Sequence, residues 1–215
     1  MDIQSLDITG YNDRPLPNTF LRQSADTDRL GIILPGYRHT VDMPDLHYIG
    51  SVLAAKGADV LKVEYAYPKT DFMKRSEQEQ SDWLAADVRA ACAAGLRQRA
   101  YGRVTLAGKS LGTLAMGHLL EDAAFESAGC IWSTPILASD WLCARIKSHR
   151  PRSLFIIGTA DHFYQPAILK ELVDATRGKA LVLQGVHHGL EIEGDMPGTL
   201  AALKRIVEAV QAFVE

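Results

Sequence analysis

Short runs of apolar and β-branched residues alternate along the chain with longer segments whose apolar residues recur at helical spacing. This alternation is typical of an α/β fold, in which helices flank both faces of a mostly parallel, doubly wound sheet. Two N-terminal segments, IQSLDI (3–8) and NTFLRQ (18–23), have the pattern of an antiparallel edge. The other runs bring the predicted sheet to about eight strands and cover residues 30–36, 58–67, 103–108, 129–135, 153–159 and 179–185.

Helical spacing is found in the segments 44–56, 76–98 and 111–122 and in the C-terminal segment. The C-terminal segment has the clearest pattern, and Pro197 suits its first turn. Its apolar stripe consists of Leu200, Leu203, Val207, Val210 and Phe213. We expect this stripe to pack on the sheet, with a homodimer interface as the alternative.

The length of 215 residues fits one α/β domain with a substantial core. No internal repeat, low-complexity tract or linker-like run divides the chain, and the prolines of YNDRPLPN (11–18) fit a loop between edge strands. Only the short segment 136–150 separates the runs at 129–135 and 153–159. We therefore predict a single α/β domain over residues 1–215, without a large cap domain.

Composition narrows the classes of partner and compartment. The formal charge of −3 shows no basic excess, so nucleic acid is not an expected partner. The N-terminus lacks signal-peptide features, and no apolar run approaches the roughly 18 residues that span a bilayer, so no membrane association is expected. The three widely spaced cysteines predict neither disulfides nor a zinc site but core thiols in a reducing cytoplasm.

The stretch AGKSLGT (107–113) fits two different motifs. GKS ends a phosphate-binding P-loop, whereas GKSLG is also G-x-S-x-G, the turn that presents a nucleophilic serine. A P-loop requires glycine at position 103, which is Arg103, and a flexible loop where RVTLA has the composition of a strand. The sequence therefore favours Ser110 as a nucleophile on a strand-to-helix turn.

Residues around Ser110 agree with this interpretation. A strained turn needs small neighbours, which Gly108 and Gly112 provide. The backbone N–H of Leu111 would begin the following helix, where the helix dipole favours an oxyanion. A second N–H donor is expected from Tyr37, after the strand that ends in LPG (34–36).

Acid and base candidates follow in the order that the nucleophile motif requires. Asp161 comes just after the strand at 153–159, and His187 and His188 follow the strand at 179–185. Because loops after the carboxyl ends of parallel strands share one crevice, Ser110, Asp161 and one of these histidines can converge. Asp140, after the preceding strand, is the alternative acid.

These motifs resemble those of the α/β-hydrolase superfamily, and among its branches the small cap-less, dienelactone-hydrolase-like members. The resemblance extends from about Leu30 to the end of the chain, and LPGY, AGKSLGT, GTADHFYQP (158–166) and QGVHHGLEIEGD (184–195) carry it. Relatives commonly have Gly-Ala-Asp-His in the last loop, which implies His188 as the catalytic histidine. Dienelactone hydrolases use cysteine where this chain has Ser110, so cleavage of dienelactone itself is not expected.

The implied function is a serine hydrolase that cleaves small carboxylic esters or thioesters through Ser110, His188, Asp161 and an acyl-enzyme, without cofactor or metal. A metal site formed by Asp161 and the nearby histidines is disfavoured because neighbouring side chains diverge. One alternative is an acyl-peptide hydrolase or acyltransferase with the same triad. The other is a non-catalytic binding module, against which the complete triad argues.

Aromatic and apolar residues in the same loops indicate an apolar or aromatic substrate group of modest size in an open site. The candidates for substrate contact are Trp132, Trp141, Phe163 and Leu190, and the alternative is loop packing. Lys109 has two interpretations: an amine in water with its stem along the sheet, or a fixed ion pair that supports the turn.

Overall fold

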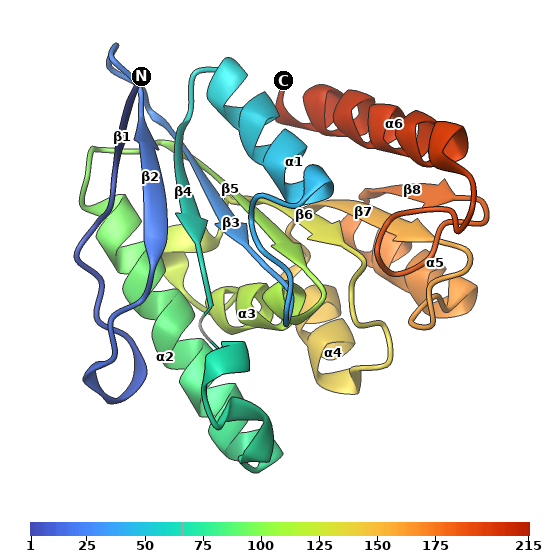
Figure 1. Cartoon of the computed structure of the whole chain (residues 1–215), viewed down its shortest axis with the longest axis horizontal. Coiled ribbons are helices and arrows are strands. Elements are labelled where there is room, and N and C mark those ends of the chain that lie inside the picture. Colours follow the sequence, from blue (N-terminus) through green and yellow to red (C-terminus); the bar gives the residue numbers. More distant parts are fainter. Residues whose placement is uncertain (66) are drawn as a thin grey trace.

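The computed structural model describes residues 1–65 and 67–215 and contains one mixed β-sheet (Figure 1). Within these residues the sheet has eight strands in the order β1-β2-β4-β3-β5-β6-β7-β8. The strands are β1 (Asp2–Gln4), β2 (Asn18–Arg22), β3 (Arg29–Leu34), β4 (Asp59–Val63), β5 (Arg103–Lys109), β6 (Gly129–Ser133), β7 (Arg152–Gly158) and β8 (Lys179–Leu183).

Parallel pairing begins at β4 and extends through β3, β5, β6 and β7 to β8. The two N-terminal strands form the antiparallel edge that the sequence predicts, with β1 on β2 and β2 on β4. Because the parallel strands all end at the same edge, the loops after β3, β5, β7 and β8 lie together there. These four loops carry the predicted nucleophile, acid, histidine and backbone N–H donors.

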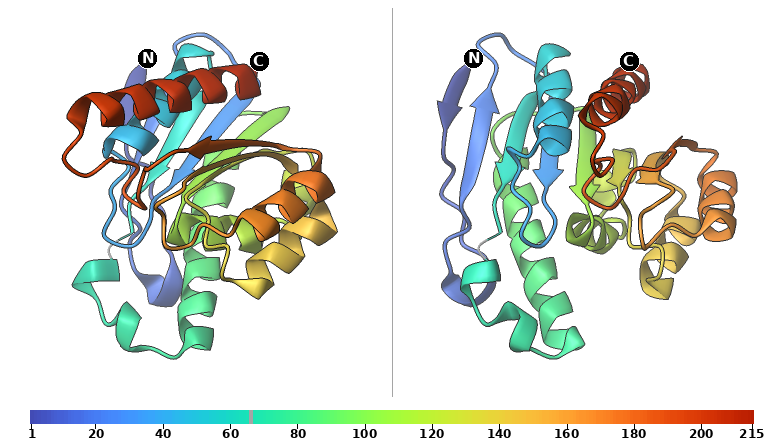
Figure 2. Two further views of the ribbon diagram at one scale, coloured as in Figure 1. Left: turned by 90° about the vertical axis from the view of Figure 1, so that its right-hand side faces the viewer. Right: turned by 45° about the vertical axis from the view of Figure 1, so that its right-hand side comes forward.

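Six helices in the described part of the chain cover the two faces of the sheet (Figure 2). Helices α1 and α6 lie on one face, and α2, α3, α4 and α5 lie on the other. Their bounds are α1 (Pro44–Ala55), α2 (Glu77–Leu96), α3 (Leu111–Leu119), α4 (Asp140–His149), α5 (Pro166–Thr176) and α6 (Met196–Val214). Short 3₁₀ helices are η1 (Tyr11–Asp13), η2 (Tyr67–Lys69), η3 (Phe72–Lys74) and η4 (Ala123–Phe125).

The strand periodicity of two divides the core between these faces. Ile32 and Leu106 point to the core beneath α2 to α5, while their neighbours Ile33 and Ala107 point to the core beneath α1 and α6. The three cysteines are free and buried, as expected for core thiols. No helix among the described residues is long and apolar enough to cross a membrane.

Two details differ from the sequence prediction. Helix α4 occupies the segment 136–150, where no helix is predicted, and Ser139 caps its N-terminus by accepting a hydrogen bond from the Leu142 amide. In α6, the buried face is rotated from the predicted stripe and consists of Thr199, Ala202, Ile206, Val210 and Phe213. Leu200 is 59% exposed and lies with Leu203 and Val207 beside Tyr48 of α1.

The connection between β6 and β7 contains only the ten-residue helix α4. The expected absence of a large cap domain is therefore confirmed, and the carboxyl edge of the sheet is left uncovered by any inserted domain.

Candidate active site

Ser110 occupies the turn between β5 and α3 in a strained conformation. Its φ of 50° and ψ of −113° lie in a region that non-glycine residues rarely adopt. Such a conformation costs about 1–3 kcal/mol and persists only when the surroundings enforce it. Two hydrogen bonds do so here: the Ser110 amide donates to the Ser133 carbonyl at 3.1 Å, and the Ser110 carbonyl accepts from the Thr113 amide at 2.8 Å.

The glycines on either side of Ser110 are required by close backbone contacts. A Cβ on Gly112 would lie 2.1 Å from the Leu34 carbonyl oxygen, and one on Gly108 would lie 2.5 Å from the Gly112 carbonyl oxygen. Neither obstacle is a flexible side chain, so any larger residue would push β3, β5 and α3 apart. The G-x-S-x-G pattern therefore has a local cause: it lets the serine turn sit against the end of β3.

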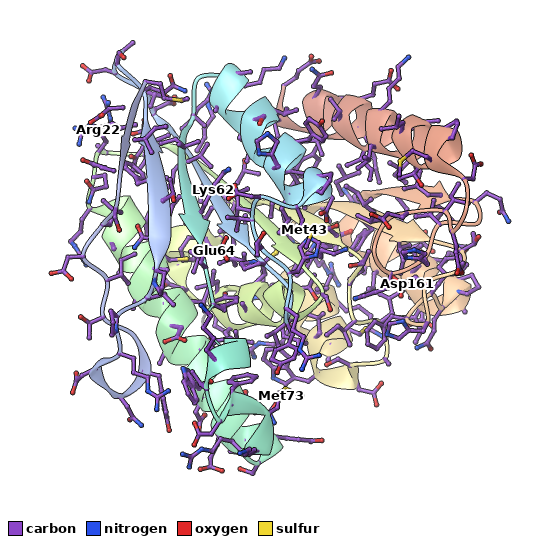
Figure 3. The ribbon with its side chains drawn as sticks, in the orientation of Figure 1. Arg22, Met43, Lys62, Glu64, Met73 and Asp161 are labelled. Atoms are coloured by element: carbon purple, nitrogen blue, oxygen red, sulfur yellow. The ribbon has the colours of Figure 1, made fainter. Side chains whose placement is uncertain are left out.

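Asp161 and His188 form a direct pair at the ends of β7 and β8. His188 Nδ1 lies 2.9 and 3.0 Å from the two Asp161 carboxylate oxygens. The Phe163 amide also donates to Asp161 Oδ1 at 2.9 Å, which gives the carboxylate a second fixed partner. With the proton on Nδ1, the other imidazole nitrogen of His188 is left as an acceptor. Figure 3 shows Asp161 at this edge of the sheet.

The charge state of Asp161 fits its partners. Burial alone would raise the pKa of this carboxyl, but the hydrogen bonds from His188 and the Phe163 amide outweigh it and lower the pKa below its usual value. The carboxylate is therefore ionised at neutral pH and can stabilise a positive charge on the His188 ring.

Lys109 joins the serine turn to the histidine loop. Its Nζ donates to the His188 carbonyl at 2.9 Å and to Thr134 Oγ1 at 3.2 Å. Among the described residues, Ser110 Oγ and His188 share no hydrogen bond.

The Lys109 amine is not in water, so that interpretation of the residue is wrong. Lys109 is only 2% exposed, and Nζ lies 3.5 Å from Oδ2 of the equally buried Asp45. Asp45 in turn bonds His39 Nε2 through Oδ1 at 2.9 Å. Burial lowers the pKa of Lys109, and attraction by Asp45 opposes this effect. A chain of three side chains, of which Lys109 and Asp45 are buried and His39 is partly buried, thus links the loops after β3, β5 and β8.

The predicted N–H donors flank the serine turn. Gly36 lies so close to Ser110 that a Cβ on Gly36 would be 3.2 Å from Ser110 Cβ. Tyr37 follows Gly36, and Leu111 is the first residue of α3. In the described part of the chain, neither the Tyr37 nor the Leu111 amide donates a hydrogen bond to another protein group. Both donors are therefore free to bind a ligand oxygen.

The alternative acid and base residues lie elsewhere. Asp140 is exposed at the first turn of α4 and makes no contact with either histidine of the 187–188 pair. His187 Nδ1 accepts a hydrogen bond from the Gly189 amide at 2.9 Å, so its ring stabilises its own loop. The structure thus brings His188, and not His187, to Asp161.

Two of the predicted substrate contacts are corrected by the structure. Trp132 is fully buried between the sheet and its helices, and its indole N–H donates to Ser153 Oγ at 3.0 Å. Leu190 is 1% exposed and packs in the core beneath α1 and α6. Phe163 does lie at the site, with its ring 5.4 Å from that of His188. Trp141 is 40% exposed and borders a groove beside α3.

A metal ion has one candidate location among the described residues. Ligand atoms of Asp161, His162 and His188 all lie within 4.8 Å of one another. However, the Asp161 oxygens already accept from His188 and from the Phe163 amide. A metal ion at this location would have to replace these hydrogen bonds, which orient the His188 ring.

The sequence alone does not indicate Asp45 or Thr134 as members of this site, whereas His39 is expected from it near the mouth of the pocket. Asp45 sits in the first turn of α1, where an acid is ordinary, and only the fold brings it to Lys109. Thr134 has a φ of 41°, an unusual value for a β-branched residue that no local motif predicts.

Comparison with known proteins supports the fold at low sequence similarity. No family model matches the sequence, and no curated protein matches it. Among solved structures, esterase Pf2001 from Pyrococcus furiosus is 14% identical with a TM-score of 0.70, and the match covers 100% of this chain and 92% of that one. Est1E from Butyrivibrio proteoclasticus is 13% identical with a TM-score of 0.72, covering 100% and 98%.

A third similar structure is XC6422 from Xanthomonas campestris, described as an α/β serine hydrolase without lid. It is 18% identical with a TM-score of 0.72, and the match covers 100% of this chain and 94% of that one. These likenesses show that the chain has the α/β-hydrolase fold over its whole length.

Proposed function

We propose that this protein is a serine hydrolase that cleaves carboxylic esters or thioesters of small substrates. The observation that carries the proposal is the strained Ser110 at the same sheet edge as the Asp161–His188 pair. A binding protein gains nothing from a strained serine at the same sheet edge as an oriented imidazole. The unpartnered amides of Tyr37 and Leu111 add the two donors that acyl transfer requires.

In the proposed reaction, His188 takes the proton of Ser110 Oγ as this oxygen attacks the substrate carbonyl carbon. Asp161 holds the imidazole in the required tautomer and stabilises its positive charge. The amides of Tyr37 and Leu111 bind the developing oxyanion, and one such donor is worth about 3–4 kcal/mol in other enzymes. His188 then protonates the leaving alcohol or thiol.

The second half of the reaction repeats these steps with water. His188 removes a proton from water, the resulting hydroxide attacks the Ser110 ester, and Ser110 Oγ regains its proton as the acid is released. The uncapped edge of the sheet supports access for water and small soluble esters.

A fluorophosphonate probe and p-nitrophenyl acetate test the proposal. Wild-type protein should be labelled and should release p-nitrophenol, while Ser110→Ala should do neither. The matched control is Ser127→Ala, because Ser127 is exposed and borders the opposite end of the sheet. Labelling that persists in Ser110→Ala would refute the assignment of the nucleophile. Absence of both reactions in folded wild-type protein would favour a binding module.

A further inference from the structure

A groove of about 300 Å³ begins at the serine turn and follows α3. Its floor is formed by Leu111, Leu114 and His118, which share one face of the helix. One wall consists of η3 and the first half of α2, including Phe72 and Leu84, and Trp141 of α4 borders the other side. Figure 3 labels Met73, the neighbour of Phe72 in η3.

The groove starts next to the candidate nucleophile. Leu111 directly follows Ser110, so their Cα atoms are about 3.8 Å apart. From Leu111 to His118 the helix rises about 10 Å. A group attached to a carbonyl carbon at Ser110 would therefore enter the groove at one end and could extend along it.

Five of the ten described lining residues are apolar, and no lysine or arginine is among them. Glu77 is the one charged residue among the lining residues that the structure describes, and it is exposed. The His118 ring packs against Trp141 at an interplanar angle of 45°, with ring centroids 4.6 Å apart, and its Nε2 lies 3.3 Å from Ser81 Oγ. Burial, aided by Arg89 and Arg145, lowers the pKa of His118 to about 4, so the ring is neutral at pH 7. The groove therefore offers an anionic group no cationic partner among the described residues, whereas its leucines and Trp141 can contact an apolar group.

The groove and the histidine loop lie toward opposite faces of the sheet. Phe72 and Leu84 belong to the core beneath α2 to α5. Val186 and Leu190, which flank His188, belong to the core beneath α1 and α6. The leaving group must face His188, because His188 protonates it. The acyl group therefore points away from His188 and toward the groove.

We propose that this groove binds the acyl chain of the substrate, and that the preferred substrates are esters or thioesters of medium-length apolar acids. This inference rests on the proposed hydrolase function. A volume of 300 Å³ equals that of about ten water molecules at ~30 Å³ each, so the groove holds an acyl group of about six to ten carbons. Longer chains would project into solvent beyond His118.

The test compares kcat/KM for p-nitrophenyl acetate, octanoate and laurate. Wild-type protein should prefer octanoate to both other esters. Leu114→Trp fills the groove and should lower the octanoate-to-acetate ratio by about tenfold or more, which corresponds to ~1.4 kcal/mol. Leu114→Ala deepens the groove and enlarges the free space, and it should shift the preference toward laurate. Leu200→Trp is the matched control, because Leu200 is exposed on α6, and it should keep the wild-type ratio.

The outcomes distinguish a failure of the groove assignment from a failure of the proposed hydrolase function. Turnover with unchanged chain-length ratios in both folded Leu114 variants would overturn the groove assignment and leave the hydrolase intact. If Leu114→Trp fails to fold, Leu114→Ala decides alone through the direction of its shift. Absence of turnover with every ester, together with absence of fluorophosphonate labelling, would overturn the proposed function and the groove with it.

Discussion

Removing the Lys109 amine should lower both the stability and the activity of the protein, for two separable reasons. Lys109→Met keeps the length of the side chain but leaves the buried Asp45 carboxylate without its cation and the His188 carbonyl without its donor. Breaking a buried ion pair by removing one partner costs about 3–5 kcal/mol. In a chain of this size that loss lowers Tm by roughly 6–20 °C, at about 2–4 °C per kcal/mol.

Catalysis should also fall, for a separate reason. Without the hydrogen bond from Lys109, the backbone of His188 is no longer held against the serine turn. A displacement of about 1 Å in a catalytic group can cost 10²-fold. We therefore expect kcat for p-nitrophenyl acetate to fall by about 10- to 100-fold in Lys109→Met.

A double variant separates the two effects. Asp45→Asn retains an acceptor for His39 and removes the unpaired charge, so Lys109→Met/Asp45→Asn should recover most of the lost free energy of unfolding. It should not recover kcat, because the His188 carbonyl still lacks its donor. Urea unfolding followed by circular dichroism gives the first quantity, and ester hydrolysis gives the second.

The matched control is Lys170→Met. Lys170 pairs with Asp174 on the exposed face of α5, and exposed pairs contribute about 0–1 kcal/mol. If Lys109→Met and Lys170→Met lose equally little stability and both retain full kcat, the Lys109 contacts neither support the turn nor position His188.

Three further predictions concern the acid, the buried histidine and metal. Asp161→Asn should lower kcat by about 10⁴-fold, which is the loss that this exchange causes in a serine protease. Asp140→Asn is the control and should be fully active. Equal activity of the two variants would refute the role of Asp161 in the triad. Because burial lowers the His118 pKa from 6.5 to about 4, the unfolded chain binds more protons between these pH values, and stability falls as pH drops through this window. His118→Gln should therefore show a smaller difference in Tm between pH 7.5 and pH 5 than wild type. EDTA should leave hydrolysis unchanged, and loss restored by zinc would instead implicate the Asp161, His162 and His188 cluster.

The fold was predictable because its signals are local. Strand runs, the antiparallel edge and the absence of a cap domain follow from residue types and spacing, and the structure confirms them. The pairing of His188 with Asp161 was also expected, because both follow the carboxyl ends of adjacent parallel strands. The serine turn needs Gly108 and Gly112 because the backbones of β3, β5 and α3 approach closely there. The G-x-S-x-G motif in the sequence indicates this requirement.

Three features of the site could not be predicted, because they depend on how deeply a side chain is buried or on contacts between residues distant in sequence. Trp132 was expected at the crevice because it lies near the end of a strand, but the alternation of β6 turns it into the core. Leu190 follows the histidine loop, yet its side chain returns to the opposite core. The sequence does not decide between the two interpretations of Lys109, because lysine is rarely buried without a partner. Its partner Asp45 lies in helix α1, far from Lys109 in the sequence.

The buried Lys109–Asp45 pair near the serine turn is better explained by the loop conformations that it fixes than by a gain in stability. A buried ion pair repays little of its desolvation cost, so stability alone gives a weak reason to place Lys109 there. Around it, Arg38, Ser110 and Thr134 all have positive φ, each at a cost of about 1–3 kcal/mol unless neighbouring contacts enforce it. Lys109 bonds Thr134 directly and reaches the loop of Arg38 through Asp45 and His39. An apolar residue at position 109 would fill the same space but could not specify these three loop positions at once.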